Sequence, residues 1–174
     1  MQKAVFLDRD GVINVEKDYL YKIVDFEFMD GTFESLKKLQ ENGFLLFVIT
    51  NQSGISRGFY TIEDFKRLNS WMLDVLAENR IKISQVEYCP HGPEDECECR
   101  KPKTGMIDNI LKKHEIDLEK SWLVGDKTSD IVCAKNANIK NTIQVKSGHD
   151  FDEEKSSADY ICQSIKDIPD IIVS

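Results

Sequence analysis

The stretch AVFLDRDG, residues 4 to 11, places four apolar residues directly before a pair of aspartates. A short apolar run of this kind is typical of a strand that is buried on both faces of a parallel sheet. The aspartates, Asp8 and Asp10, fall where the chain leaves this predicted strand. Because ligands bind beyond the carboxyl ends of strands in open α/β sheets, we expect both carboxylates to face a binding crevice.

Similar apolar runs alternate with amphipathic stretches along the rest of the chain. We predict further strands over residues 44–50, 83–88, 122–124 and 142–145 and near Tyr160, and helices over residues 32–40, 61–78, 104–114, 128–136 and from Ser164. This order predicts an α/β fold with a doubly wound, mainly parallel sheet and helices on both faces. At 174 residues the chain is predicted to form a single domain, residues 1–174.

Charge and composition narrow the classes of partner. The formal net charge is −8, from 23 basic and 31 acidic residues, and no basic stripe is present, so nucleic acid is not expected as a partner. No run of 18 apolar residues and no secretory leader pattern is seen, which predicts a cytoplasmic protein without a membrane partner. We expect a monomer that binds a small anionic substrate. At the binding site, local cations or a metal would have to offset the negative electrostatic potential of the acidic protein.

Polar side chains that could take part in catalysis lie at the ends of three predicted strands. Asp8 and Asp10 follow the first strand, Thr50 ends the second, and Asp126 follows the strand at 122–124. Carboxylates from two strands would repel one another without a cation between them, and Mg²⁺ prefers such oxygen ligands. Asp8 can then act as a nucleophile on phosphorus, with Asp10 as the general acid and base. Thr50 and the turn at residues 51–54 offer donors for phosphoryl oxygens.

Each of these residues also has a structural interpretation. Asp8 and Asp10 alone could be turn formers, Thr50 a strand end, and Asp126 the N-cap of the next helix. Their order and their common position at strand ends favour the functional interpretation.

The motifs DRDGV (residues 8–12), TNQSG (50–54), RKP (100–102) and GDKTSD (125–130) resemble those of haloacid-dehalogenase-type phosphatases over residues 4–146. The resemblance implies a Rossmann-like fold and hydrolysis in two steps through a phosphorylated Asp8. It further implies Mg²⁺ held by Asp8, the backbone carbonyl of Asp10, and Asp126, with Asp130 as a supporting or helix-facing carboxylate. The motif spacings leave no room for a cap domain, so an open site is expected.

A second metal is predicted in the stretch YCPHGPEDECECRKPK, residues 88–103. Cys89, His91, Cys97 and Cys99 form a Cys₃His set, which suits a closed, structural Zn²⁺ site in a loop over residues 89–99. The alternative, a chance cluster of unliganded thiols, is weakened by four candidate ligands within eleven positions. An odd total of five cysteines also argues against disulfides here.

Two cations follow the last predicted zinc ligand directly. Arg100 and Lys101 would emerge from a metal-fixed loop, whereas an isolated basic triplet with Lys103 would usually be a solvated face. The resemblance implies that Lys101 stabilises the transferring phosphoryl group and that Arg100 recognises substrate. Lys103 is interpreted as a surface charge.

Within the superfamily, the zinc loop is similar to two groups, the heptose 1,7-bisphosphate phosphatases and the histidinol-phosphate phosphatases. The stretch TNQSGISRGFYT, residues 50–61, resembles the heptose group, and Lys127 and Arg57 favour the same group. This implies removal of the C7 phosphate of a sugar bisphosphate in the synthesis of nucleotide-activated heptose for surface glycans such as lipopolysaccharide. The predicted substrate-binding residues are Arg9, Glu16, Lys17, Asp18, Tyr19, Asn51, Gln52, Ser53, Arg100 and Lys127.

Two alternatives remain open at this point. One is a histidinol-phosphate phosphatase, and the other is a non-catalytic, receiver-like phosphoacceptor module, which also uses a strand-end aspartate and Mg²⁺. His114 and His149 are interpreted as surface or loop histidines, with the acidic segment 149–159 as a surface loop.

Overall fold

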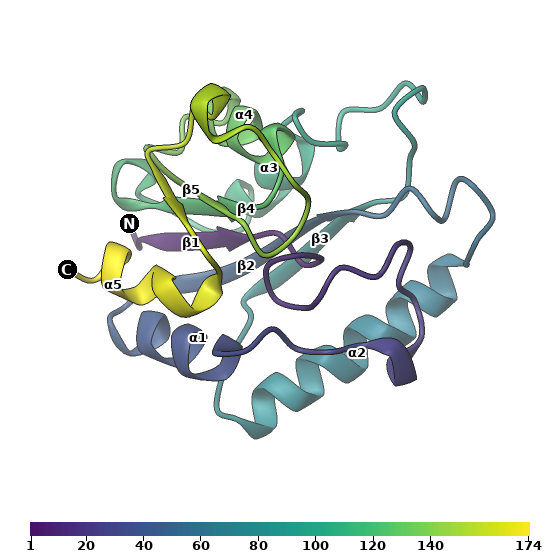
Figure 1. The fold of residues 1–174 in the computed structure, drawn as a ribbon, viewed down its shortest axis with the longest axis horizontal. Coiled ribbons are helices and arrows are strands. Elements are labelled where there is room, and N and C mark those ends of the chain that lie inside the picture. The colour runs from purple at the N-terminus through teal and green to yellow at the C-terminus, as the bar shows by residue number, and fades with distance from the viewer.

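The computed structural model describes residues 1–174 and contains one six-stranded sheet in which every neighbouring pair is parallel (Figure 1). The strand order is β3-β2-β1-β4-β5-β6. The strands are β1 (Ala4–Leu7), β2 (Leu45–Asn51), β3 (Gln85–Cys89), β4 (Trp122–Gly125), β5 (Asn141–Val145) and β6 (Tyr160–Cys162). This sheet confirms the predicted doubly wound fold.

Helices cover both faces of the sheet, as expected. Figure 1 shows α1 (Thr32–Glu41), α2 (Ile62–Glu78) and α5 (Ile168–Ile172) on one face, and α3 (Gly105–Leu111) and α4 (Thr128–Asn136) on the other. Side chains of β1 alternate between the two layers, because successive residues of a strand point to opposite faces. Val5 and Leu7 belong to the core under α1 and α2, while Ala4 and Phe6 pack in the core under α3 and α4.

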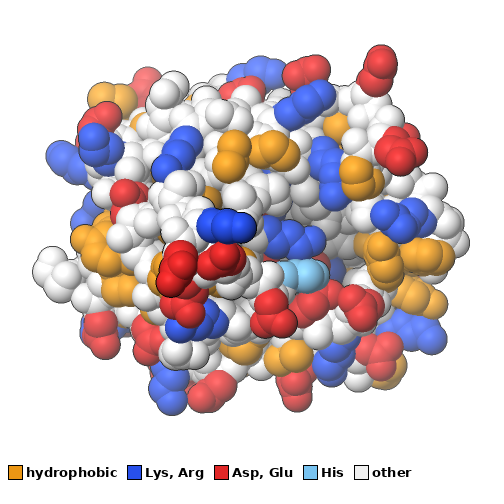
Figure 2. All heavy atoms as spheres, turned by 45° about the horizontal axis from the view of Figure 1, so that its top comes forward, with side chains coloured by type: hydrophobic (Ala, Val, Ile, Leu, Met, Phe, Trp, Pro, Cys, Tyr) orange, Lys and Arg blue, Asp and Glu red, His pale blue; other side chains and the backbone are white.

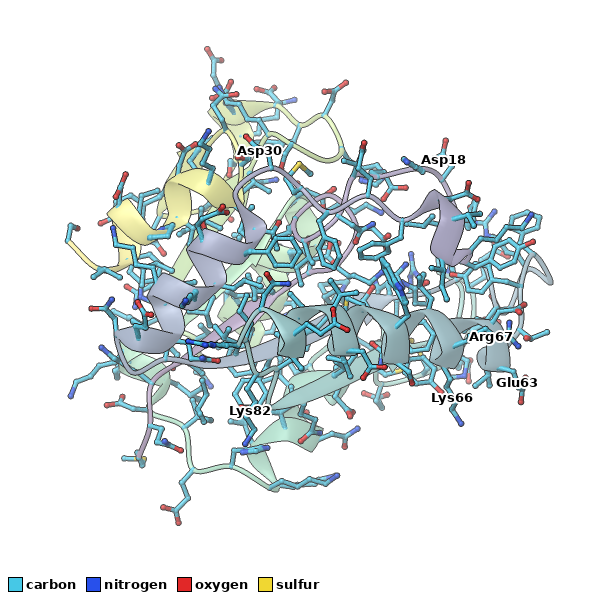
Figure 3. The ribbon with its side chains drawn as sticks, turned by 90° about the horizontal axis from the view of Figure 1, so that it is seen from below. Asp18, Asp30, Glu63, Lys66, Arg67 and Lys82 are labelled. Carbon is cyan, nitrogen blue, oxygen red and sulfur yellow. The ribbon has the colours of Figure 1, made fainter.

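Helix α2 begins with a capping box. The Thr61 hydroxyl accepts from the Asp64 amide at 3.1 Å, and Asp64 Oδ2 accepts from the Thr61 amide at 3.0 Å. These bonds satisfy two amide groups that would otherwise lack partners at the helix start. The helix covers one face of the sheet, and Figure 3 shows Glu63, Lys66 and Arg67 at its N-terminal end.

One predicted helix is shorter than its sequence suggested. Helix α3 ends at Leu111 rather than His114, because the amides of Lys113 and His114 both bond to the carbonyl of Ile110 and close the last turn. His114 then lies beside Gln85 of β3, with Nε2 and Oε1 3.2 Å apart.

Strand β1 occupies the point where the strand order reverses, between β2 and β4. In this topology a crevice opens at the carboxyl ends of the strands on either side of the reversal. The connection from β1 to α1 is a loop with a single 3-10 turn at Ile23–Asp25, and it contains no additional domain. None of the helices is both long enough and apolar enough to cross a lipid bilayer.

Candidate active site

A cavity lies at the carboxyl ends of the central strands, where the topology places the crevice. Figure 2 shows a hollow on this face of the molecule, with basic and acidic side chains and a histidine around it. Eleven of the predicted site residues line the cavity: Asp8, Asp10, Glu16, Asp18, Tyr19, Asn51, Gln52, Ser53, Arg100, Lys101 and Lys127. Segments far apart in the sequence therefore meet in one place.

The ammonium group of Lys101 binds directly to Asp8. Lys101 Nζ lies 3.0 Å from Asp8 Oδ1, 2.7 Å from Asp130 Oδ1 and 2.9 Å from the carbonyl oxygen of Ile49. Three acceptors thus match the three donors of the ammonium group. Burial would lower the pKa of Lys101, but the charges of Asp130 and Asp8 raise it, so the side chain stays charged.

Asp8 belongs to a cluster of three buried carboxylates. One oxygen from each of Asp8, Asp126 and Asp130 lies within 4.8 Å of the others. Burial raises the pKa of Asp8 well above its usual range, and the charges of Asp130 and Asp126 raise it further against the opposing effect of Lys101. Such a cluster holds its charge at neutral pH only with a compensating cation.

The orientation of Asp126 leaves one oxygen available to that cation. Its Oδ2 accepts from the backbone N–H of His149 at 2.8 Å and lies 2.7 Å from the Nδ1 atom of the same residue, whereas its buried Oδ1 has no hydrogen-bond partner. A Cβ at Gly148 would lie 2.2 Å from Asp126 Oδ2, so only glycine allows this close approach. Because Mg²⁺ prefers carboxylate oxygens, the donor set fits this ion.

Asp130 connects the cluster to the start of α4. Its Oδ2 accepts from the amide of Lys127 at 3.1 Å, while its Oδ1 binds Lys101. Asp130 therefore caps the start of α4 and binds the buried Lys101 at the edge of the cavity.

Three side chains hold the carboxylate of Asp10. Its Oδ1 accepts from Arg9 Nη2 and Asn14 Nδ2, each at 3.0 Å, and its Oδ2 accepts from Gln52 Nε2 at 3.1 Å. Burial alone would raise the pKa of Asp10, but the Arg9 charge and the three donors together lower it. Asp10 is therefore ionised in the free protein.

Three of the predicted catalytic and substrate-binding residues do not line the cavity. Arg9 is 1% exposed and lies behind Asp10, where its Nη2 also donates to the carbonyl oxygen of Leu20. Thr50 is equally buried, with its hydroxyl accepting from Gln52 Nε2 at 2.8 Å. Lys17 points away and donates to the carbonyl oxygen of Asp25. The structure therefore places none of these three side chains in the cavity lining, and their predicted roles stay predictions.

Other lining residues were not in the predicted set. Arg57 and Tyr60 come from the loop after β2, and His149 comes from the loop after β5. His149 lies in a loop, as expected, but its imidazole also contacts Asp126 at the site, which the sequence did not indicate. The close approach of Gly148 to Asp126 brings this loop into the cavity.

The four predicted zinc ligands lie together at the end of β3. Their ligand atoms all fall within 4.8 Å of one another. Cys89 Sγ is 3.6 Å from His91 Nδ1 and 3.9 Å from Cys97 Sγ, and His91 Nδ1 is 3.4 Å from Cys99 Sγ. The four side chains are therefore close in space as well as in the sequence.

Hydrogen bonds connect this cluster to the cavity. The Asn51 side chain accepts from the amide of Lys101 at 3.1 Å and donates to its carbonyl oxygen at 3.4 Å. Arg100 Nη1 donates to the carbonyl oxygen of His91 at 3.3 Å, and the amide of Gln52 donates to that of Cys89 at 2.7 Å. The loop thus fixes where Arg100 and Lys101 enter the site.

Comparisons with known proteins agree with this geometry. Residues 98–168 match a family model described as "HAD-hyrolase-like". The chain is 42% identical over 179 residues to the D-glycero-beta-D-manno-heptose-1,7-bisphosphate 7-phosphatase of Pasteurella multocida, covering 99% of this chain and 97% of the relative. The chain belongs to the heptose-1,7-bisphosphate 7-phosphatase family. As a member of this family it is a phosphoric monoester hydrolase of the HAD type.

Relatives within the heptose-1,7-bisphosphate 7-phosphatase family differ in the anomer that they are named for. The Campylobacter jejuni relative, 44% identical over 170 residues and covering 98% of this chain and 94% of its own, is named for the alpha anomer. A crystal structure of the D,D-heptose 1,7-bisphosphate phosphatase from B. bronchiseptica, complexed with magnesium and phosphate, superposes with a TM-score of 0.86. It is 27% identical and covers 98% of each chain. These relatives favour neither the histidinol-phosphate phosphatase nor the receiver-like module.

Proposed function

We propose that the chain hydrolyses the C7 phosphate ester of D-glycero-D-manno-heptose 1,7-bisphosphate in a reaction that requires Mg²⁺. The observation that carries this proposal is the position of Asp8, which lines one cavity with Asp10, Asp130 and cations from three separate segments and forms a carboxylate cluster with Asp126 and Asp130. The names of the relatives supply the substrate class.

Asp8 is the proposed nucleophile. Its carboxylate attacks phosphorus in line with the C7 oxygen, and the Lys101 ammonium group stabilises the charge on the transferring phosphoryl group. Asp8, the backbone carbonyl of Asp10, and Asp126 would hold Mg²⁺, which supplies positive charge against the carboxylates and the phosphate. Backbone amides of the turn at residues 51–54 complete the phosphoryl site, and the buried Thr50 hydroxyl supports it through its hydrogen bond with Gln52 Nε2.

Asp10 acts as the proton carrier in both steps. The approach of a phosphate dianion raises the proton affinity of the neighbouring carboxylate, so Asp10 takes up a proton on substrate binding. It passes this proton to the C7 oxygen as the bond from that oxygen to phosphorus breaks. Asp10 then accepts a proton from the water that cleaves the phosphorylated Asp8.

The remainder of the cavity suits a second phosphate joined to a polyhydroxylated chain. Arg57, Arg100 and Lys127 bring positive charge to the lining, and arginine can bind a phosphate in a bidentate way. Glu16 and Asp18, from the loop between β1 and α1, provide acceptors for the hydroxyl groups of the sugar. The product, a sugar 1-phosphate, fits the predicted role upstream of nucleotide-activated heptose.

We also propose that the Cys₃His cluster binds a structural Zn²⁺. With Zn–S bonds of about 2.3 Å and Zn–N bonds of about 2.05 Å, a tetrahedral site has S···S edges of about 3.8 Å and S···N edges of about 3.6 Å. The observed edges of 3.9, 3.6 and 3.4 Å lie close to these values. All four positions are filled by protein ligands, which is typical of a structural site.

The test compares substrates with Mg²⁺-loaded protein. Phosphorus NMR should show loss of the C7 ester signal and retention of the C1 ester signal, with α and β anomers assayed separately. Chelation of Mg²⁺ should stop phosphate release. A higher kcat/KM on histidinol phosphate, or a single stoichiometric phosphorylation without turnover, would contradict the proposal.

A further inference from the structure

A hydrogen-bond chain joins Tyr60 to Asp10 through Gln52. The Tyr60 hydroxyl donates to Gln52 Oε1 at 2.5 Å, and Gln52 Nε2 donates to Asp10 Oδ2 at 3.1 Å. All three residues line the cavity. The chain therefore reaches from the loop after β2 to the proposed proton carrier.

The direction of the chain follows from its chemistry. An ionised carboxylate can only accept hydrogen bonds, so the amide nitrogen of Gln52 must face Asp10. The amide oxygen then faces Tyr60, which must act as the donor. Burial raises the pKa of Tyr60 to about 12, so the phenol keeps its proton at any pH at which the enzyme would work. Each group in the chain thus has one defined role.

Two independent features fix the ring of Tyr60. Tyr21 stacks on it with ring centroids 5.3 Å apart and an interplanar angle of 13°. In addition, a Cβ at Gly54 would lie 2.2 Å from Tyr60 Cε1, so the ring occupies space that glycine alone leaves open. The position of the hydroxyl is therefore fixed by the packing of the ring, independently of its hydrogen bond to Gln52.

The two oxygens of Asp10 differ in what reaches them. Oδ1 accepts from Arg9 and Asn14, whereas Oδ2 accepts from Gln52 alone. A carboxylate oxygen with a single donor keeps a lone pair for a proton. Oδ2 is therefore the atom of Asp10 that can exchange a proton with substrate, and Gln52 sets its direction.

We propose that Tyr60 is a positioning residue that, through Gln52, aims Oδ2 of Asp10 at the leaving-group oxygen. This inference rests on the proposed function and adds to it a group that touches neither phosphorus nor the proton. In the step, a bond forms between Asp8 and phosphorus while the bond from phosphorus to the C7 oxygen breaks. The released electron pair on that oxygen takes the proton from Oδ2.

The leaving group supplies a test that separates positioning from structure. A sugar alkoxide is a poor leaving group that needs the proton, whereas 4-nitrophenolate leaves without it. Tyr60→Phe should lower kcat/KM on the heptose bisphosphate by roughly tenfold. The variant loses one hydrogen bond and leaves the buried Gln52 Oε1 without a donor. The same variant should change kcat/KM on 4-nitrophenyl phosphate less than about twofold.

Tyr21→Phe is the matched control. It also removes one phenol hydroxyl from the stacked pair, but no hydrogen bond of that hydroxyl is present and Tyr21 does not line the cavity. Its kcat/KM should stay at the wild-type value on both substrates. Equal losses for Tyr60→Phe on both substrates, or no loss on either, would overturn the inference.

A double-mutant cycle keeps the inference testable if Tyr60→Phe folds poorly. Gln52→Met should show a loss that is again larger for the sugar phosphate than for the aryl phosphate. Adding Tyr60→Phe to Gln52→Met should cause no further loss, because both residues act through one chain. Additive losses would refute the chain. If the wild type rejects the heptose bisphosphate, the proposed function fails, and the leaving-group comparison is made with whichever alkyl phosphate the wild type accepts.

Discussion

Replacing Lys101 by methionine should destabilise the metal-free protein strongly. The ammonium group is 3.0 Å from Asp8 and 2.7 Å from Asp130, and these side chains are between 1% and 11% exposed. Methionine fills similar space but leaves two buried carboxylates without their cation. Removing one partner of a buried ion pair costs about 3–5 kcal/mol. For a chain of this size that loss lowers Tm by about 6–20 °C.

The assay is thermal unfolding followed by circular dichroism, with and without Mg²⁺. Lys38→Met is the control, because Lys38 forms a surface pair with Asp170 at 3.7 Å and should change Tm by less than about 2 °C. Mg²⁺ should raise the Tm of Lys101→Met more than that of the wild type, since it replaces the missing positive charge.

The pH dependence has a defined sign. The folded-state pKa of Asp8 is already raised by burial, and removal of Lys101 takes away a charge that lowers it. A carboxyl whose pKa is higher in the folded state stabilises the fold at acidic pH and loses that effect as pH rises through the folded-state pKa. The Tm deficit of Lys101→Met should therefore be larger at pH 8 than at pH 5. A Tm loss no greater than that of Lys38→Met, at both pH values, would refute this account of the carboxylate cluster.

Three other variants test the proposed roles of single residues. Asp8→Asn should lower kcat by more than about 10⁴-fold while the fold and the bound zinc are retained, and wild-type-like turnover would exclude Asp8 as the nucleophile. Arg100→Ala should lower kcat/KM by roughly 10–100-fold on the bisphosphate and by less than about threefold on an aryl monophosphate, because a charged hydrogen bond to the second phosphate is lost. Equal losses on the two substrates would argue against that contact. Cys99→Ser should weaken zinc binding by at least about tenfold, measured by metal analysis after dialysis against a chelator, and unchanged zinc content would contradict the Cys₃His site.

The sheet could be predicted from the sequence because its four central strands are buried on both faces. Runs such as residues 4–7 and 122–124 have no polar residue at all, and amphipathic stretches separate them. The strand ends then placed Asp8, Asp10 and Asp126 at one edge of the sheet without any knowledge of side-chain contacts. The Cys₃His cluster could be found because its four members lie close together in the sequence.

The remaining site residues depend on contacts between loops, which sequence patterns do not encode. Arg9 lies between two cavity-facing aspartates, but it begins a turn and its side chain is buried behind Asp10, where it donates to the carbonyl oxygen of Leu20. Lys17 turns to a carbonyl oxygen of its own loop. His149 begins an acidic, polar segment, which gave it the composition of a surface loop. No sequence motif marks Tyr60. Its proposed positioning role depends on contacts with Gln52 and Tyr21 and on the absence of a side chain at Gly54.

The central position of β1 has a consequence for folding. Its pairing with β2 joins Ala4 to Leu45, whereas its pairing with β4 joins Val5 to Trp122 and closes a much longer loop. Contacts between such distant segments form slowly, because much chain entropy is lost before they are made. Asp8 and Asp126 meet only once that pairing exists. Recovered catalysis is therefore a direct reporter of the final docking of the two halves of the sheet, and no fragment lacking β4 can be active.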